Sequence, residues 1–415
     1  MKKKNIILTA VGSSGDIHPM IALGRELQVM GHHPILAVNN YFQKLVEQNG
    51  LPFVQLGVAE DYLRSEQNPD LWHPTKSFEV IVEEAIGPCI RPLYDILTAF
   101  DPADTIVVSS GLMYGARIAH EKLGLPWVTV HLQPSVFRSF YDTPIMGNVA
   151  LPEWLPHWFK RGYFNLLDVA VIDRLLGKKV NPLREEMGLP PQSQFFGETI
   201  HAPQKSIGLF PAWFAAPQPD WPPQIELTGF VRYDRGETAV LSPTITDFLV
   251  AGEPPLVFTA GSAMHYGQPF FQTSAAAAQR LGRRAILVSR STDQFPAHLP
   301  DTILPVTYVP FSLLLPHAAA LVHHGGIGTV AQALAAGVPQ LVMPMSHDQP
   351  DNARRLERLG VGATLPPKQY QETAVADQLT KLLQSPKTRQ QCVHWVQQVN
   401  FDHALVQTCR AIVSL

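Results

Sequence analysis

Three glycines stand between a short apolar run and a helix-like segment in the last quarter of the chain. Residues 318–322 predict a buried strand, and residues 323–329, with the sequence HHGGIGT, follow it directly. A strand-to-helix turn of this kind exposes backbone N–H groups and a helix N-terminus, which suit the charge and geometry of a diphosphate. We therefore expect a phosphate ester to bind at this turn.

An acid and an amide stand side by side further along the chain. Asp348 and Gln349 follow a second apolar run, residues 340–345, at the point where a parallel strand would end. Adjacent carboxylate and carboxamide groups are suited to hydrogen-bonding the vicinal hydroxyls of a sugar. The alternative is a helix N-cap at Asp348, ahead of Pro350. The ordered combination of glycine turn, acid and amide is more specific than any of its parts.

This ordered set resembles the donor-binding signature of the family 1 nucleotide-sugar glycosyltransferases. Residues 308–311 (YVPF) occupy the position where that family carries an aromatic residue and then proline, and residues 12–19 (GSSGDIHP) are similar to the opening of bacterial and sterol-type members. Residues 71–72, 116–122 and 209–215 resemble more narrowly the rhamnosyltransferases of bacterial rhamnolipid synthesis. The resemblance covers nearly the whole sequence.

The resemblance implies an α/β protein of GT-B architecture, with two doubly wound, Rossmann-like domains facing across a cleft. It implies an inverting glycosyltransferase that moves a hexosyl unit, rhamnose or glucose, from a dTDP- or UDP-sugar to a hydroxyl of a lipophilic acceptor. No cofactor and no metal are implied, because the nucleotide-sugar is a co-substrate. A catalytically inactive nucleotide-sugar-binding subunit is the alternative, and the retention of Asp16, His324, Asp348 and Gln349 together counts against it.

The same resemblance assigns the donor site. His324 would contact the departing diphosphate and stabilise its developing charge, although the rhamnolipid relatives keep the first histidine of the pair, which corresponds to His323. Tyr308 would stack on the base, with Val309 beside it, and Asp348 and Gln349 would hold the sugar. The remaining diphosphate contacts would come from Ser262, Gly326, Gly328 and Thr329.

Gln332 stands where relatives that use UDP-sugars place a glutamate that holds both ribose hydroxyls. An amide binds a diol less firmly than a carboxylate does. This difference leaves room for a deoxyribose donor such as dTDP-rhamnose.

Asp16 is the candidate general base. It follows a glycine turn at the carboxyl end of the first expected strand, where ligands bind in open α/β sheets. Relatives in other branches carry histidine at this position, and this chain is similar to the branch with aspartate. An ordinary N-cap is the alternative, because Pro19 follows near the first turn of the expected helix. At the usual aspartate pKa of ~3.9 the group would be a weak base, so position would matter more than basicity. His18 is a further candidate for contact with the acceptor.

Composition excludes several classes of protein. The chain has 415 residues, of which 46% are hydrophobic and 16% charged, with a formal net charge of −3. This balance predicts sizeable cores and argues against nucleic acid as a partner. Three scattered cysteines suit a reducing cytosol and do not form a zinc pattern. The apolar run after the N-terminal lysines is too short for a signal peptide, and no stretch approaches the ~20 apolar residues of a membrane span.

Apolar runs alternate with helix-like segments in two parts of the chain, which predicts two parallel sheets covered on both faces. We expect an N-terminal acceptor domain over residues 1–235, a donor domain over 236–390, and a helical segment over 391–415 that packs back on the first domain. The expected strands of the first sheet are residues 6–11, 34–38, 52–55, 105–109 and 127–131, and its first helix covers about 19–30. The proline-rich stretch 203–255 is expected to hold the linker between the domains.

An aromatic insertion is expected over about residues 137–176. Trp154 and Trp158 are four residues apart and would share one face of a helix. Three roles remain open for them: lining an apolar acceptor pocket, contacting a membrane surface at the cytoplasmic side, or packing against the domain core. The sequence does not name the acceptor or the oligomeric state.

Overall fold

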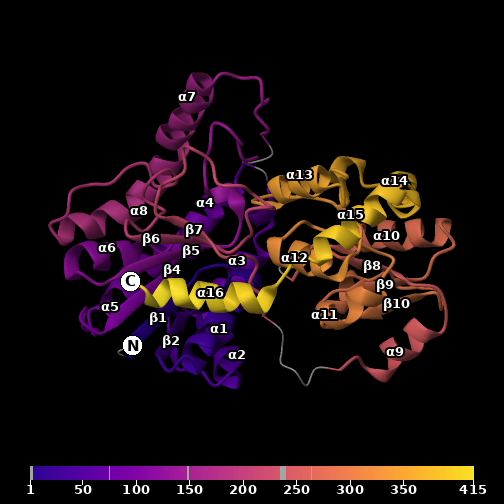
Figure 1. The fold of residues 1–415 in the computed structure, drawn as a ribbon, viewed down its shortest axis with the longest axis horizontal. Helices are drawn as coiled ribbons and strands as arrows, with labels where there is room; N and C mark the ends of the chain where they lie inside the picture. The colour runs from indigo at the N-terminus through magenta and orange to yellow at the C-terminus, as the bar shows by residue number, and fades with distance from the viewer. Residues whose placement is uncertain (1–2, 74, 147–148, 234–239, 263) are drawn as a thin grey trace. The chain divides into compact units, whose positions relative to one another are not determined.

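The chain divides into two compact units. The computed structural model describes residues 3–73, 75–146, 149–233, 240–262 and 264–415. Unit 1 comprises Met1–Val231 and Phe401–Leu415, and unit 2 comprises Arg232–Asn400. In Figure 1, unit 1 runs from indigo to pink and includes the final yellow helix, whereas unit 2 holds the orange elements.

Unit 1 is built on a seven-stranded sheet in the order β3-β2-β1-β4-β5-β6-β7, with every pair parallel. The first five strands confirm the expected alternation of apolar runs and helices. The strands are β1 (Asn5–Thr9), β2 (His33–Val38), β3 (Phe53–Gln55), β4 (Thr105–Ser110), β5 (Trp127–His131), β6 (Lys205–Gly208) and β7 (Ile225–Leu227). The α-helices are α1 (Ser14–Val29), α2 (Gln43–Gln48), α3 (Ala59–Gln67), α4 (Ser77–Ile81), α5 (Gly87–Leu97), α6 (Tyr114–Leu123), α7 (His157–Leu167), α8 (Asp173–Glu186) and α16 (Phe401–Val413).

The strand order reverses at β1, which pairs with β2 on one side and with β4 on the other. Crossover helices on opposite faces of the sheet leave a crevice at such a reversal, beyond the carboxyl ends of the strands. The loop between β1 and α1 lies at this point, and it carries the glycines and Asp16.

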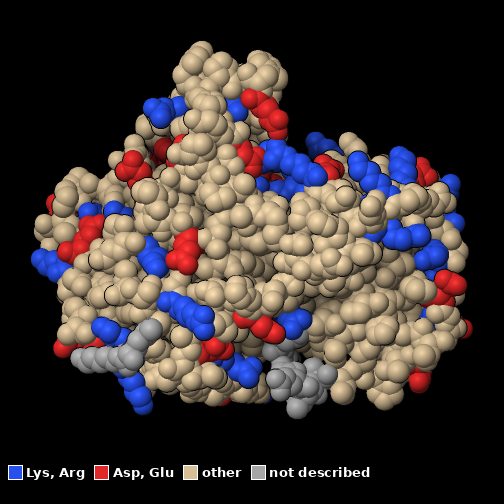
Figure 2. Space-filling view, viewed as in Figure 1, with Lys and Arg blue, Asp and Glu red and all other residues tan. Residues whose placement is uncertain are grey.

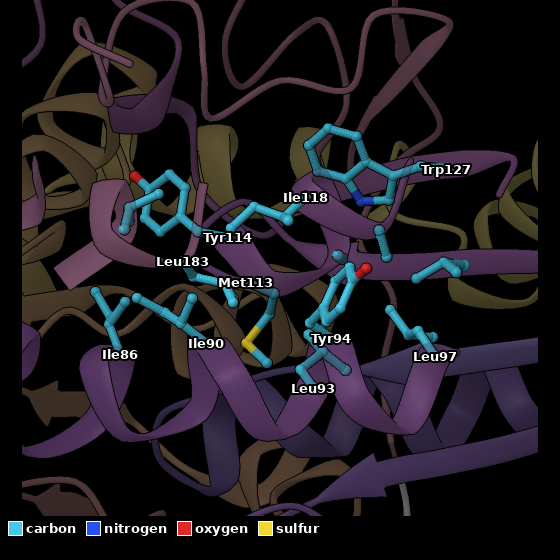
Figure 3. Close-up of a cluster of buried hydrophobic side chains, with 14 of the residues drawn as sticks. Ile86, Ile90, Leu93, Tyr94, Leu97, Met113, Tyr114, Ile118, Trp127 and Leu183 are labelled. Atoms are coloured by element: carbon cyan, nitrogen blue, oxygen red, sulfur yellow. The ribbon is translucent and has the colours of Figure 1, made fainter. Parts of the chain in front are cut away.

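A cluster of buried side chains fills the space between one face of this sheet and helices α5, α6 and α8 (Figure 3). Two large aromatic residues of the cluster carry a polar atom, and each of these atoms has a hydrogen-bond partner. The Trp127 Nε1 donates to Ser109 Oγ at 2.9 Å, and the Tyr114 hydroxyl donates to the Phe195 carbonyl at 3.3 Å. These bonds remove the cost of burying the two polar atoms, so the aromatic rings contribute their full apolar area to the core.

Unit 2 repeats the plan with a six-stranded parallel sheet in the order β10-β9-β8-β11-β12-β13. Its reversal point is β8, between β9 and β11. The strands are β8 (Leu256–Thr259), β9 (Ala285–Val288), β10 (Ile303–Val306), β11 (Ala320–His323), β12 (Gln340–Val342) and β13 (Gly362–Thr364). The α-helices are α9 (Pro243–Val250), α10 (Gln268–Arg280), α11 (Phe311–Leu314), α12 (Ile327–Ala336), α13 (Gln349–Leu359), α14 (Glu372–Gln384) and α15 (Pro386–Val396).

The C-terminal boundary differs from the expected one at residue 391. Helix α15 belongs to unit 2, where the Trp395 Nε1 donates to the Leu359 carbonyl at 3.1 Å. Only α16 belongs to unit 1. It packs on α1, and the Thr408 and Thr228 hydroxyls lie 2.7 Å apart. The expected boundary at 235–236 lies outside the described residues.

The division between the units, between Val231 and Arg232, lies within the stretch 203–255 that was expected to hold the linker. The same stretch also contains β6 and β7, which complete the first sheet, and α9 of unit 2. These elements are short and lie among prolines, so their apolar runs give little signal. The aromatic insertion becomes helical at His157, and the helical path continues through a π-helical turn, η5 (Asp168–Ile172), to the end of α8 at Glu186. Among the described residues, no helix combines the length and apolar character that crossing a bilayer would require.

Candidate functional site

Asp16 belongs to a capping box at the start of α1. The backbone N–H of Ser13 donates to Asp16 Oδ2 at 2.8 Å, and Ser13 Oγ accepts from the Gly15 N–H at 3.2 Å. This reciprocal arrangement satisfies backbone donors that the first helical turn leaves without partners. The helix therefore begins at Ser14, earlier than the expected start near Pro19, which lies inside it. Ser13 is the N-cap, so the N-cap alternative for Asp16 is wrong.

Close approach to Gly12 holds the Asp16 carboxylate in place. A Cβ atom on Gly12 would lie 2.2 Å from Asp16 Oδ2, and Gly12 has a φ of +131°, which favours glycine. Burial raises the pKa of Asp16 to about 6, although its hydrogen bonds from Ser13 act in the opposite direction. A carboxylate with this pKa is mostly ionised at pH 7 and is a better proton acceptor than an ordinary aspartate.

His18 points in a different direction from Asp16. Residues two apart on a helix do not face each other, and both side chains lie on the first two turns of α1. His18 is half-buried. The structure therefore gives no reason to treat the two side chains as one group.

His324 packs between two glycine backbones at the end of β11. A Cβ atom on Gly261 would lie 2.8 Å from the imidazole Cε1, and one on Gly326 would lie 2.5 Å from Nε2. Burial lowers the pKa of His324 to about 4, so the ring is neutral at pH 7. Its Nδ1 atom is buried and has no hydrogen-bond partner within the described part of the chain, and the residue as a whole is half-buried. The ring can therefore offer a neutral N–H to a ligand without removing it from another protein group.

His323 is buried, and both of its ring nitrogens have partners inside the protein. Its side chain is fully buried, Nε2 lies 3.0 Å from Gln340 Oε1, and Nδ1 accepts from the Gly325 N–H at 3.1 Å. Burial lowers its pKa to about 3, so this ring is also neutral. Both nitrogens are therefore engaged inside the protein, and His324 is the histidine with capacity for a ligand.

The N-terminus of α12 has no side-chain cap. Its N-cap residue is Gly326, and Gly328 is exposed while Thr329 is half-buried. Gln332 lies one turn further along, where its Nε2 donates a long bond of 3.5 Å to the Gly328 carbonyl. Gly326, Gly328, Thr329 and Gln332 thus lie at the N-terminal end of α12. This end offers backbone N–H groups and the positive end of the helix dipole to an anion.

Asp348 is joined to the glycine turn through Asn352. The Asn352 Nδ2 donates to Asp348 Oδ2 at 2.6 Å and to the Gly325 carbonyl at 2.9 Å. Asp348 occupies the N-cap position of α13, but its side chain makes no capping hydrogen bond. The preceding residue, His347, has a φ of +61°, an unfavourable conformation for a residue with a Cβ. The loop thus holds the carboxylate at a fixed place relative to the turn after β11.

Gln349 faces the protein interior. Its side chain is buried, and Oε1 accepts from the N–H groups of Met345 at 2.8 Å and Ser346 at 3.3 Å. The amide oxygen is therefore used to shape the loop, and only the amide nitrogen remains for the expected contact with a sugar.

The other expected donor residues lie at separate strand ends of unit 2. Ser262 is exposed and follows β8, beside Gly261 and therefore near the His324 ring. Tyr308 follows the edge strand β10 and is 46% exposed, whereas the Val309 side chain is packed in the core. Neighbouring strands lie ~4.8 Å apart, so the end of β10, three places from β11 in the sheet, is roughly 14 Å from the His324 turn. Only the backbone of Val309 is available to a ligand.

The aromatic residues expected to meet the acceptor form part of an exposed stripe on unit 1. The expectation that Trp154 and Trp158 share one helical face is wrong, because Trp154 lies in a turn and α7 begins only at His157. Trp154 and Trp158 are 80% and 74% exposed, which excludes the alternative that they pack in the core. Lys160, Phe164 and Asp168 occupy the buried side of the same helical path. The projecting helix α7 shows mainly uncharged surface in Figure 2.

Two contacts at the sites could not be predicted from sequence motifs. The first is the bond from Asn352 to Gly325. The spacing of four residues between Asp348 and Asn352 predicts that their side chains meet on a helix, but the contact with Gly325 depends on the fold. A buried histidine pair, His131 Nε2 and His201 Nδ1 at 3.1 Å, lies at the end of β5, and 70 positions separate its members in the chain. Among the described residues, no cluster of histidine, cysteine and acidic side chains could hold a metal ion.

Comparisons with known proteins identify the family and the fold. The glycosyltransferase family 28 N-terminal domain matches residues 6–141, and the C-terminal domain of erythromycin biosynthesis protein CIII-like matches residues 277–404. The O-mycaminosyltylonolide 6-deoxyallosyltransferase of Streptomyces fradiae is 30% identical over 389 residues, covering 86% of this chain and 84% of that protein.

Two solved structures share the fold. A glycosyltransferase of kitacinnamycin superposes with a TM-score of 0.76 at 20% identity, covering 100% of this chain and 99% of the other. The spinosyn rhamnosyltransferase SpnG, complexed with thymidine diphosphate, superposes with a TM-score of 0.68 at 18% identity, covering 98% and 100%. This chain therefore belongs to the family 1 nucleotide-sugar glycosyltransferases, and its two parallel-sheet units have the GT-B fold.

Proposed function

We propose that the chain transfers a hexosyl unit from dTDP- or UDP-sugar to a hydroxyl of a lipophilic acceptor, with inversion. The observation that carries the proposal is the arrangement in unit 2 of an uncapped helix N-terminus, a neutral buried imidazole and a carboxylate joined to the same turn by Asn352. These groups match the diphosphate and the sugar hydroxyls of one ligand.

The proposed reaction is a single displacement. Asp16 accepts the proton of the acceptor hydroxyl as its oxygen attacks the anomeric carbon, and the bond from that carbon to the diphosphate breaks. The electron pair leaves with the nucleoside diphosphate, whose charge is stabilised by the α12 N-terminus and by a hydrogen bond from neutral His324. Attack from the face opposite the leaving group inverts the anomeric configuration.

Asp16→Asn should lower transfer by at least ~10²-fold, the usual effect of losing a general base, while nucleotide binding stays nearly unchanged. The amide oxygen of asparagine can still accept from the Ser13 N–H, so the capping box survives. In the wild type, transfer should fall as the pH is lowered through about 6, where Asp16 becomes protonated. Steady-state rates against pH, with calorimetry of nucleotide binding, provide the measurement.

Thermal stability of the same variant separates catalysis from folding. Because the folded pKa of Asp16 lies above its unfolded value, ionisation destabilises the folded wild type as the pH rises from 4 to 7. The asparagine variant should therefore melt no lower than the wild type at pH 7, and its advantage should shrink toward pH 4. Wild-type turnover in this variant would remove Asp16 from the base role.

His324→Ala and Asp348→Ala should fail in different ways. His324 is proposed to contact the leaving diphosphate, so its loss should weaken binding of free UDP or dTDP as well as turnover. Asp348 is proposed to contact only the sugar, so its loss should impair the nucleotide-sugar and leave the free nucleotide bound normally. Calorimetric titration of both ligands into both variants gives the comparison, and equal behaviour toward free nucleotide would contradict this division of roles.

Donor choice is proposed to follow from Gln332. SpnG was solved with thymidine diphosphate, and so was the glycosyltransferase VinC with dTDP, which supports a deoxyribose donor for a chain of this fold. If the 2′-hydroxyl is not required, dTDP should bind within about tenfold of UDP, a difference of ~1.4 kcal/mol at most. Gln332→Glu should shift preference toward UDP by adding a charge-assisted hydrogen bond to the ribose. A wild-type protein that binds UDP tightly and ignores dTDP would contradict the proposal.

A lipophilic acceptor is proposed from the exposed stripe of unit 1, and the narrower resemblance makes a rhamnolipid-type glycolipid one candidate. Trp158, Leu166 and Val169 are 68–74% exposed along the helical path of α7 and η5, and Trp154, in the turn before α7, is 80% exposed; together they form a large exposed apolar area. Trp154→Ser with Trp158→Ser should raise the KM for a long-chain hydroxy-acyl acceptor several-fold and leave nucleotide binding unchanged. Leu63→Ser, on α3, is a control for the loss of an exposed apolar side chain. If the double variant loses only sedimentation with lipid vesicles, the stripe contacts a membrane and not the acceptor.

A further inference from the structure

The side chain of Gln294 closes the loop between β8 and α10. Gln294 ends a short 3₁₀ turn, η6 (Thr292–Gln294), that follows the neighbouring strand β9. Its Nε2 donates to the Met264 carbonyl at 2.7 Å, and its Oε1 accepts from the Gly267 N–H at 3.1 Å. One carboxamide therefore joins both sides of the turn formed by residues 264–267.

The fit around this carboxamide is tight. Gln294 is only 3% exposed, and a Cβ atom on Gly267 would lie 2.3 Å from its Oε1. The next residue, Phe295, makes an edge contact with Phe271 of α10, with ring centroids 5.3 Å apart. A buried amide with both hydrogen-bonding ends satisfied in this way favours one arrangement of the backbone it holds.

The loop that Gln294 holds adjoins the candidate diphosphate site. It begins at Gly261, whose backbone packs against the His324 ring, and continues with exposed Ser262. It ends at Gly267, the N-cap of α10, which makes no side-chain cap. The loop follows β8, the strand at which the order of the sheet reverses. The Met264 N–H in turn donates to the Gly261 carbonyl at 3.5 Å, so Gln294 holds a residue that bonds back to the glycine packed against His324.

We propose that Gln294 is a positioning residue for diphosphate binding, which rests on the proposed function of unit 2. It does not contact the ligand. It holds the β8–α10 loop in the bound arrangement before the nucleotide arrives, so that binding does not have to order the loop. Loss of the carboxamide should weaken contacts to the diphosphate while contacts to the base and ribose, which involve other strand ends, persist.

The test compares dTDP with thymidine, and UDP with uridine, by calorimetry. Gln294→Met keeps the length of the side chain and removes both hydrogen bonds. Gly267→Ala leaves Gln294 in the sequence but displaces its amide, and the Gly267 φ of −84° accepts alanine. Both variants should bind each diphosphate about tenfold more weakly and each nucleoside within about twofold of wild type.

Ser274→Ala is the matched control. Ser274 is buried on α10 and hydrogen-bonds to the Phe270 carbonyl at 2.7 Å and the Tyr370 hydroxyl at 2.8 Å, away from the loop. Its loss should lower the melting temperature and leave both affinities unchanged. If Gln294→Met does not fold, Gly267→Ala, which leaves the Gln294 side chain in place in the sequence, carries the comparison alone.

Three results would overturn the proposal. Unchanged diphosphate affinity in the Gln294 and Gly267 variants would show that the loop needs no such support. An equal loss for nucleoside and diphosphate would show general damage to unit 2. A wild-type protein that binds neither diphosphate would overturn the proposed function, and this inference with it.

Discussion

The absence of a Cβ atom at two glycine turns sets where the reactive side chains of this protein lie. Asp16 rests against Gly12 and His324 against Gly261, at distances that a Cβ atom would not permit. Both glycines have positive φ values, +131° and +96°, so alanine would meet backbone strain as well as a clash. Each turn follows the strand at which its sheet reverses order, β1 in unit 1 and β8 in unit 2. The parallel topology and these glycines together produce the two candidate sites.

Burial against those turns gives the two groups their charge states. Removing water raises the pKa of Asp16 to about 6 and lowers that of His324 to about 4. At pH 7 the carboxylate is therefore ionised and able to accept a proton, while the imidazole is neutral and can donate a hydrogen bond without carrying charge. The same physical cause, loss of solvent, favours the charge states that the proposed roles of Asp16 and His324 require.

Much of the fold can be predicted from the sequence, because strands that are buried on both faces consist of uninterrupted apolar runs. The strand of residues 127–131 was predicted at its observed bounds, and most others differ by a residue or two. The predictions failed for both local and tertiary reasons. The start of α1 depends on the Ser13–Asp16 capping box, and β6 and β7 are too short to show a period. Helix α15 joins unit 2 through contacts such as that of Trp395, which no local pattern displays.

The residues of the candidate site likewise include some that the sequence predicts and some that it does not. Motif order singled out the glycine turn, Asp16 and Asp348 as candidates, because those residue types suit the expected chemistry. The residues that hold them are less visible: Asn352 joins Asp348 to the turn, Gln349 shapes its loop, and Gln294 holds the loop after β8. Asn352 and Gln294 bond to backbone groups 27 and 30 residues away, which no local pattern reveals. Gln349 bonds to backbone groups only three and four residues away, but its residue type alone does not show that its side chain turns inward. The choice between His323 and His324 likewise needed the partners of each ring.

Unit 2 is proposed to bind a nucleoside diphosphate, and thermal unfolding with UDP, dTDP and GDP tests this binding most directly. A ligand that binds only the folded state stabilises it by ~2.7 kcal/mol at a concentration one hundred times its Kd. We expect UDP or dTDP to raise the melting temperature in a concentration-dependent way. If neither nucleotide shifts it even at millimolar concentration, the assignment of the glycine turn as a diphosphate site is wrong.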